Sequence, residues 1–178
     1  DGSFRGYRGV GRDISERRRV QAQITRLAYF DALTRLPNRR MLTERLDRAR
    51  AATLRSGGHA ALLFIDLDNF KDLNDTQGHH TGDRLLLQVA QRLQQCVGAG
   101  DTVARLGGDE FVVLSERLPA DGLGARQAAA QLARRVIESL SQPYTLEGLS
   151  HHSTPSIGIV LFGDQPYGVD DLLQHADL

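Results

Sequence analysis

The chain has a single cysteine, no excess of charge of either sign and no long apolar run. Among its 178 residues Cys96 is the only cysteine, which excludes an intrachain disulfide and a zinc site built from several cysteines, and is typical of a reducing compartment. Lys plus Arg number 22, as do Asp plus Glu, and this zero net charge argues against a dedicated nucleic-acid binder. No stretch approaches the roughly 20 apolar residues of a membrane span, and no signal peptide is recognisable. We therefore expect a cytoplasmic protein with no membrane segment in this chain. The chain does not begin with Met, which leaves room for upstream segments that attach the whole protein to a membrane.

Two common nucleotide and metal motifs are also missing. No P-loop is present, so a nucleotide would not be held by a Walker A lysine. The pair Asp66-x-Asp68 could begin a calcium loop, but Lys71 and Gln77 stand where that loop needs Gly and Glu. A calcium loop is therefore disfavoured.

The most informative stretch that the chain does contain is Arg-Leu-Gly-Gly-Asp-Glu-Phe at residues 105–111. Gly107 and Gly108 lie between two apolar runs, a pattern that predicts a tight β-hairpin. A hairpin tip without side chains lets a ligand approach the backbone closely. Asp109 and Glu110 follow directly, and two carboxylates at such a tip suit a hard cation such as Mg²⁺, which usually arrives with phosphates.

The order of elements predicts the fold. Strand, helix, strand, strand, helix, strand is the ferredoxin-like βαββαβ arrangement, an α+β fold with a palm-type antiparallel sheet and helices packed around it. In this arrangement we expect the helices on one face of the sheet, and a last helix cut short at Leu178. Pro155 lacks a backbone donor, so the last strand should begin only after it. The expected elements are a helix at 15–30, a helix opening at 36–38 and ending near 56–58, a strand at 60–65, a helix at 83–97, the glycine hairpin, a helix at 125–140, a strand at 156–162 and a helix from 169 onward.

Acidic side chains gather at one end of this predicted sheet. Asp66 and Asp68 directly follow the apolar strand and point to the same face if that strand stays extended. The hairpin pairs beside that strand in this topology, so Asp109 and Glu110 can reach Asp66. Acids clustered in this way repel one another unless a cation binds, and phosphoryl transfer needs such a cluster. The alternative for Asp66 and Asp68, a solvated strand end, stays open at this point.

Polar residues after the strand could hold a nucleotide. Lys71 supplies a positive charge for phosphates, whereas Asn74 and Asp83 offer the groups that can pair with a guanine edge. A turn at Asn74-Asp75 and a helix N-cap at Gly82-Asp83 are simpler alternatives for the same residues.

The histidines are weaker candidates for metal ligands than the acids. His79 more simply orders its loop than binds a metal. His151 and His152 are adjacent, so on a strand their side chains diverge, and a surface position is favoured for both.

Together these segments resemble the GGDEF family of diguanylate cyclases. The resemblance covers about residues 29–178, and the segments occur in the family's order. Any one of them could arise by chance, but all five together are specific. They are residues 31–39, 64–75, 78–83, 105–111 and 156–158.

The resemblance implies a metal-dependent synthesis of a cyclic dinucleotide. Two such domains face each other as a homodimer, and each holds one GTP. Each 3′-hydroxyl attacks the opposing α-phosphate, which gives cyclic di-GMP and two pyrophosphates. The cofactor implied is Mg²⁺ or Mn²⁺.

The resemblance also assigns roles to individual residues. Asp109 matches the proposed proton acceptor and Lys71 the group that stabilises the transition state, with Glu110 as a further catalytic acid. The implied metal ligands are Asp66, the Leu67 carbonyl, Asp109 and Glu110. The implied substrate-binding residues are Asn74 and Asp83 at the guanine, His79 at the nucleotide, Phe70 and Lys71 at the phosphates, and Gly107 and Gly108 at the hairpin tip.

The N-terminal segment suggests a division into domains. Residues 1–13 look like the end of an upstream PAS-like sensor, and 14–30 like a linker helix or short coiled coil with a narrow apolar stripe. The GGDEF catalytic domain would then occupy 31–178. We expect the sensor to adjust how two catalytic domains meet.

The chain departs from the family at two places. Many members carry an inhibitory product site, Arg-x-x-Asp, before the hairpin; Asp101 is present here, but Gly98 replaces the arginine, so we expect no inhibition through that site. The family also continues past Asp177 with a Lys and an Arg that hold the triphosphate. We therefore expect this chain, which stops at Leu178, to turn over slowly or not at all.

Two other functions remain open from the sequence. A non-catalytic module that binds GTP or cyclic di-GMP would share the same guanine-reading residues. A structural dimerisation domain driven by the helix at 15–30 would leave the acidic cluster unexplained.

Overall fold

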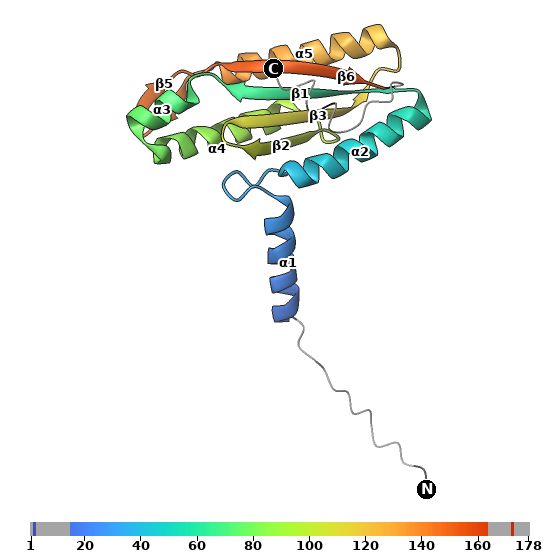
Figure 1. The fold of residues 1–178 in the computed structure, drawn as a ribbon, viewed down its shortest axis with the longest axis horizontal. Helices are drawn as coiled ribbons and strands as arrows, with labels where there is room; N and C mark the ends of the chain where they lie inside the picture. Colours follow the sequence, from blue (N-terminus) through green and yellow to red (C-terminus); the bar gives the residue numbers. More distant parts are fainter. Residues whose placement is uncertain (1, 3–14, 164–171, 173–178) are drawn as a thin grey trace.

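The structure is a computed structural model that describes Gly2, residues 15–163 and Leu172; Figure 1 shows the fold. The helix expected from residue 169 lies outside the described residues except for Leu172. In chain order the elements are α1 Ser15–Tyr29, α2 Arg39–Ser56, β1 His59–Leu67, α3 Phe70–Gln77, α4 His79–Cys96, β2 Thr102–Gly107, β3 Glu110–Leu118, α5 Gly122–Leu140, β4 Tyr144–Leu146, β5 Leu149–His151 and β6 Pro155–Phe162.

A four-stranded antiparallel sheet forms the centre of the molecule, with the strand order β2-β3-β1-β6. β1 is central and pairs on one side with β3, where Ile65 lies opposite Phe111, and on the other with β6, where Asp66 lies opposite Ser156. Together with α4 and α5, these strands make the predicted βαββαβ fold, which is confirmed.

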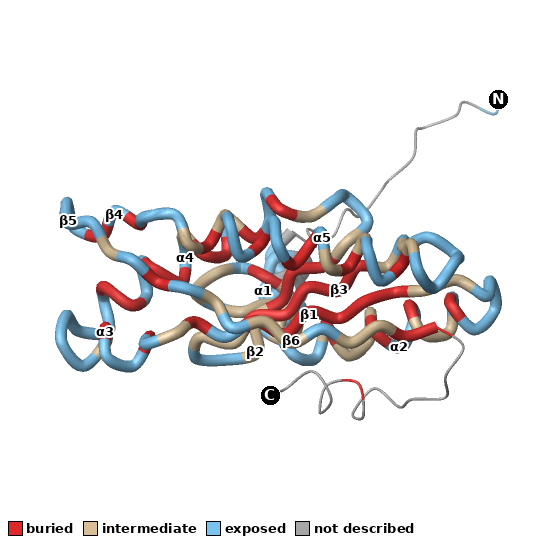
Figure 2. The backbone as a smooth tube through the Cα atoms, turned by 90° about the horizontal axis from the view of Figure 1, so that it is seen from above, coloured by how far each residue is buried: buried red, intermediate tan, exposed pale blue. Residues whose placement is uncertain are grey.

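Helices cover both faces of this sheet, so the expectation of helices on one face is wrong (Figure 2). Alternate residues of β1 enter different cores: Leu63 packs with α4 and α5, whereas Leu62 packs with α2 and Leu172. The physical reason is that β1 is apolar on both faces, and full burial of one leucine side chain stabilises the fold by about 1.5–3 kcal/mol. α2 supplies Leu42 and Leu46 for the second face.

The ends of α2 and α5 follow from local capping. The Asn38 side chain accepts a hydrogen bond from the Met41 N–H at 3.1 Å, and Asp121 likewise accepts one from Gly124 at 2.6 Å. These bonds satisfy N–H groups that have no partner within the helix. α2 ends at Gly57, whose φ of 66° is the left-handed conformation that glycine adopts without strain.

Two segments near the end of β1 differ from the sequence-based expectation. Residues 70–77 form the short helix α3, which was not predicted because only Phe70 and Leu73 are buried. α4 begins at His79, so Gly82 and Asp83 lie within its first turns and are not an N-cap. The predicted turn at Asn74-Asp75 is likewise part of α3.

Two features after α5 also differ from the sequence-based expectation. β6 begins at Pro155, which pairs with Leu67, because the first residue of an edge strand needs no donor toward solvent. A small hairpin, β4–β5, precedes it and was not predicted, since its strands are three residues long and pair only with each other. Arg92 of α4 contacts this hairpin: its guanidinium carbon lies 3.8 Å from the centre of the Tyr144 ring.

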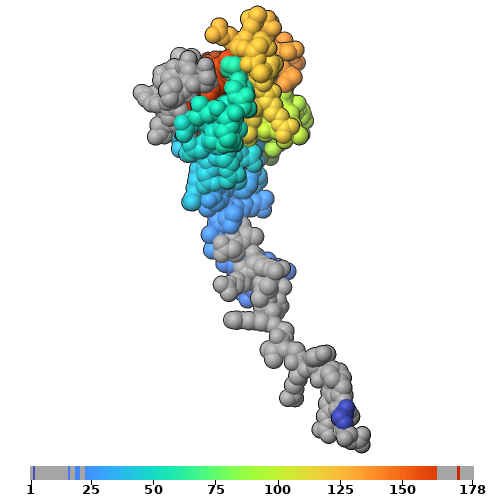
Figure 3. Space-filling view, turned by 90° about the vertical axis from the view of Figure 1, so that its right-hand side faces the viewer, coloured from blue at the N-terminus to red at the C-terminus, as the bar shows by residue number. Residues whose placement is uncertain are grey.

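α1 projects from the body of the domain (Figures 1 and 3). Its apolar side chains are exposed: Val20 by 51%, Ile24 by 55% and Leu27 by 63%. Its end is tied to the domain by Asn38, which donates to the Ala28 carbonyl at 3.1 Å. None of the helices in the described part of the chain has the length and apolar character to cross a membrane.

Candidate functional site

The predicted acidic cluster lies where β1 ends beside the start of β3. Ile65 pairs with Phe111, so the same register continued by one residue sets Asp66 opposite Glu110. Opposite residues of an antiparallel pair point to the same face, here the face covered farther along by α2. Asp66 is exposed, and Asp109 and Glu110 are half-buried. Pairing thus brings acids together that are more than forty positions apart.

The hairpin tip is as open as its sequence predicted. Gly107 and Gly108 have φ values of 154° and 49°, which other residues adopt only with strain. A Cβ added to either glycine would meet no atom within 4 Å. The tip therefore offers backbone and the Asp109 carboxylate to an approaching ligand.

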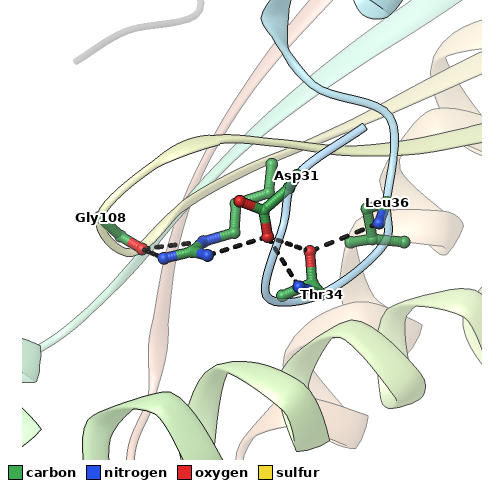
Figure 4. A network of polar contacts seen from close by, with 5 residues as sticks. Asp31, Thr34, Leu36 and Gly108 are labelled. Atoms are coloured by element: carbon green, nitrogen blue, oxygen red, sulfur yellow. Dashed lines mark hydrogen bonds and ion pairs between the residues drawn. The ribbon is translucent and has the colours of Figure 1, made fainter. Parts of the chain in front are cut away.

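Arg105 holds this tip in place (Figure 4). Its Nε and Nη2 donate to the Gly108 carbonyl at 3.0 and 2.7 Å, and its Nη1 donates to Asp31 Oδ1 at 2.9 Å. The same Asp31 oxygen accepts bonds from the Thr34 N–H at 2.7 Å and hydroxyl at 2.6 Å. The turn after α1 is thereby linked to the hairpin tip.

This contact changes the pKa of Asp31. Burial alone raises the pKa of this carboxyl, but hydrogen bonds from Thr34 and Arg105, with the charge of Arg105, outweigh burial, and the pKa lies below its ordinary value of 3.8. The sequence predicted no role for these three residues beyond their place in the matching segments. The Asp-x-x-Thr spacing, typical of local side-chain to backbone hydrogen bonds, was the available signal.

The predicted base-reading residues come together from α3 and α4. Asn74 lies so close to Gly82 that a Cβ there would stand 2.1 Å from Asn74 Oδ1 and 3.2 Å from Phe70 Cζ. Asp83 follows Gly82 and is exposed. Asn74 Oδ1 is buried against Gly82 and has no hydrogen-bond partner among the described residues, so it is an unsatisfied acceptor.

The other predicted residues lie around the same end of β1 (Figure 1). Phe70 is buried and Lys71 exposed in the first turn of α3, and exposed His79 begins α4. His151 ends β5 and His152 follows it, two residues before Thr154, whose hydroxyl contacts Asp68; burial and the neighbouring His152 lower the pKa of His151.

The acids do not form a complete metal cage. Across the described residues, no three His, Cys, Asp or Glu side chains gather closely enough to hold an ion. The acids present nevertheless fit Mg²⁺, which keeps several waters and is usually bound by one or two carboxylates plus substrate phosphates. Asp66 and the hairpin acids supply the hard oxygens that such a site needs.

A cavity of about 460 Å³ lies away from these acids, between α1 and the turn that follows it. It is lined by Arg19, Gln23, Arg26, Leu27 and Arg35. The chemistry of the acidic end of β1, rather than a cavity, identifies it as the candidate site.

Removing the Arg105 guanidinium should loosen the hairpin tip. Arg105→Ala leaves the Asp31 carboxylate without its cation, and we expect the free energy of unfolding to fall by about 2 kcal/mol, the scale of hydrogen bonds to charged groups. Denaturant unfolding at pH 7 measures this loss. Arg134→Ala, on the exposed face of α5, is the control, and an equal effect of both changes would contradict the role of Arg105.

The same pair predicts a pH dependence. Because the folded pKa of Asp31 is depressed, its stabilisation is present above the ordinary value of 3.8 and is lost as the pH falls through the lower folded value. The stability difference between the wild type and Arg105→Ala should therefore shrink below about pH 4. A difference that stays constant there would show that the charge of Asp31 contributes nothing.

Comparison with known proteins agrees with this geometry. The family model described as diguanylate cyclase, GGDEF domain, matches residues 28–178. The bifunctional diguanylate cyclase/cyclic di-GMP phosphodiesterase MucR of Pseudomonas aeruginosa is 44% identical over 160 residues, which are 89% of this chain and 22% of MucR. The chain thus spans under a quarter of that relative.

Solved structures are similar over most of the chain. The isolated GGDEF domain of TpbB from Pseudomonas aeruginosa is 39% identical with a TM-score of 0.76, over 84% of each chain. The coiled coil and GGDEF domain of DgcB from Caulobacter crescentus, solved with c-di-GMP, is 27% identical with a TM-score of 0.80, over 93% of this chain and 85% of that one. The protein chain belongs to the GGDEF domain family of diguanylate cyclases.

Proposed function

We propose that the chain is the catalytic part of a diguanylate cyclase that condenses two GTP into cyclic di-GMP and two pyrophosphates. The observation that carries the proposal is the β1–β3 register, which sets Asp66 opposite Glu110 beside the glycine hairpin. α3 begins three residues after β1, and the first N–H groups of a helix have no partner within it, so they suit phosphate oxygens.

The proposed metal is Mg²⁺ or Mn²⁺, held by Asp66, the Leu67 carbonyl and Asp109, with Glu110 as a further ligand. Asp66 is exposed at the end of β1, and the hairpin tip leaves room for phosphates. When bound, the ion neutralises charge on the phosphate oxygens.

The proposed chemistry then depends on the chain's own side chains. Asp109 accepts the proton of the 3′-hydroxyl as that oxygen bonds to the α-phosphorus of the other GTP and pyrophosphate leaves. Lys71, exposed in the first turn of α3, sets a positive charge near the phosphates. Phe70 adds backbone contacts to the same phosphates.

Guanine is proposed to bind between α3 and α4. Asn74 and Asp83 pair with its edge, and the unpartnered Asn74 Oδ1 supports this assignment. His79 at the start of α4 contacts the nucleotide. The carboxylate of Asp83 would accept the N1 and N2 protons of guanine. Adenine does not present donors at these two positions.

Two copies are needed, because each domain holds one GTP. The exposed stripe of Val20, Ile24 and Leu27 on α1 has the spacing of a coiled-coil seam and suits a second α1. In the DgcB structure a coiled coil accompanies the GGDEF domain. We accordingly propose 14–30 as the linker helix between an upstream sensor ending at 1–13 and the catalytic domain at 31–178.

Product inhibition through an Arg-x-x-Asp site is not part of the proposal. Gly98 has no side chain to bind a phosphate. Both Asp101 oxygens bond within the domain, Oδ2 to the Gly98 N–H at 3.0 Å and Oδ1 to the Ser115 hydroxyl at 2.9 Å. Asp101 therefore stabilises its own turn.

Asp109→Asn should abolish cyclic di-GMP formation while leaving the fold intact. The amide cannot accept a proton, and a loss of at least about 100-fold is expected, the contribution of a general base. Product is measured by chromatography after incubation with GTP and Mg²⁺, for this chain and for a version extended beyond Leu178. If the extended wild type binds GTP but forms no product, the chain is a regulatory binding module and not a cyclase.

Gly82→Ala should weaken GTP binding about tenfold or more. The new methyl group displaces the Asn74 amide, so the polar groups of the guanine edge lose their partner, and unpaired polar groups lower the affinity of a site by at least this factor. Isothermal calorimetry measures the affinity. Gly98→Ala is the matched control, since its Cβ would stand 3.5 Å from Asp101 Oδ2, an ordinary contact distance. Equal affinities of the two variants would remove Asn74 from the guanine site.

Ile24→Glu should break the proposed α1 pairing. A charge in an apolar seam disfavours association, so we expect a lower dimer fraction and lower cyclase activity at equal protein concentration, with GTP binding per chain unchanged. Analytical ultracentrifugation measures the dimer fraction. Gln23→Glu, at the adjacent exposed position, is the control, and an unchanged dimer in Ile24→Glu would place the dimer interface elsewhere.

A further inference from the structure

Asp68 follows β1 by one residue, and its carboxylate is occupied on both oxygens. Oδ2 accepts a hydrogen bond from the Thr154 hydroxyl at 2.5 Å, and Oδ1 accepts one from the Ser156 hydroxyl at 2.8 Å. The Asp68 N–H also donates to the Thr154 carbonyl at 2.9 Å. We call these three residues the β1–β6 clamp.

The clamp draws Asp68 toward β6, on the side of β1 opposite to the hairpin. Ser156 lies directly across from Asp66 in the β1–β6 pair, whereas on the other side the β1–β3 register, continued by one residue past Ile65 and Phe111, sets Glu110 across from Asp66. The two acids of Asp66-x-Asp68 therefore have different surroundings. Asp66 lies beside the acidic hairpin, whereas Asp68 is bound by hydroxyl groups that neutralise no charge but fix its direction.

The chain changes direction immediately after the clamp. Asn69 has a φ of 60°, the left-handed conformation, and its side chain makes no capping bond to α3. Asn69 therefore contributes its backbone, whose carbonyl accepts the Leu73 N–H at 3.2 Å, but no side-chain bond to the helix that follows. The bonds of Asp68 to Thr154 and Ser156 join this turn to the start of β6.

The turn lies between two groups of site residues. The Leu67 carbonyl precedes it, and Phe70 and Lys71 follow it at the start of α3. A shift of the turn would move the proposed metal ligand relative to the phosphate contacts. Outer partners of metal sites act in this way, by orienting the groups that touch the ion.

We propose that Asp68 is a positioning residue of the cyclase site and not a metal ligand, and that Thr154 and Ser156 are its working partners. The proposal rests on the proposed function for its effect on catalysis. The positioning role requires that the side chain at residue 68 form two hydrogen bonds, and it does not require a negative charge. Asparagine can meet that requirement, because its amide oxygen accepts from one hydroxyl while its N–H donates to the other.

The test compares Asp68→Asn with Asp68→Ala and with the double change Thr154→Val/Ser156→Ala. Asp68→Ala should lower kcat/KM about 10- to 100-fold, the effect of losing an outer partner of a metal site. The double change should lower it similarly and add little when combined with Asp68→Ala. Asp68→Asn should keep most of the wild-type kcat/KM, with the Mg²⁺ concentration for half-maximal rate unchanged. Thr145→Val, an exposed threonine of β4, is the control.

Asp66→Asn supplies the reference for a metal ligand, because there we expect a raised Mg²⁺ requirement. If Asp68→Asn is as impaired as Asp68→Ala and also needs more Mg²⁺, Asp68 is a ligand and the proposal is overturned. If Asp68→Ala leaves kcat/KM unchanged, the clamp positions nothing that catalysis uses.

Hydrogen exchange separates this proposal from the proposed function. In the absence of nucleotide, amides of α3 from Leu73 to Gln77 should exchange about tenfold faster in Asp68→Ala and in the double change, the factor for one net hydrogen bond, and at the wild-type rate in Asp68→Asn. Amides of α5 should not change. Unaltered exchange in α3 would refute the clamp even if the wild type makes cyclic di-GMP, and altered exchange would support it even if no product forms.

Discussion

The pairing of β1 with β3 is the constraint on which the rest of the site depends. Both strands are apolar on both faces, so alternation of apolar and polar residues does not by itself distinguish one register from the next. The charged residues at the ends of the strands distinguish one register from the next. A slip of one residue would turn Asp66 or Glu110 to the other face of the sheet, toward the core packed by α4 and α5, and burial of an unpaired carboxylate costs several kcal/mol. The same pairing that fills the two cores therefore also brings the acids together.

Side-chain contacts between distant segments then hold the turns at this end of the sheet. Arg105 ties the hairpin tip to the turn after α1, and Asp68 ties the turn after β1 to the start of β6. In each case a charged group binds a neutral or oppositely charged partner at short distance, which makes the bond stronger than a neutral one. The site residues lie in these turns or in the elements that begin and end at them, so these contacts fix the site residues relative to the sheet.

The link through Arg105 also connects α1 to the site. α1 ends where Asn38 and Asp31 fix the following turn, and Asp31 contacts the arginine that holds the hairpin. A change in the direction of α1 thus has a short physical route to the acids, through a partly buried ion pair. At the position of the Arg-x-x-Asp motif, by contrast, Asp101 bonds within its own turn.

The sequence alone was sufficient for the family, the order of the main elements and the acidic hairpin, because these depend on local patterns: an apolar run, helical spacing, and glycines that permit positive φ. It also indicated Asn74 and Asp83 as candidate guanine-reading residues, with a turn and an N-cap as the simpler alternatives. The helices that carry them were missed, because the polar helix α3 and the first turn of α4 have too few apolar residues to be recognised. The second layer of helices, the contact of Asn74 with Gly82, and the different surroundings of Asp66 and Asp68 were decided by the tertiary structure. These features arise between distant segments; Asp68 and Ser156, for example, are 88 positions apart. No local propensity encodes which hydroxyl or guanidinium a carboxylate will meet once the strands have paired.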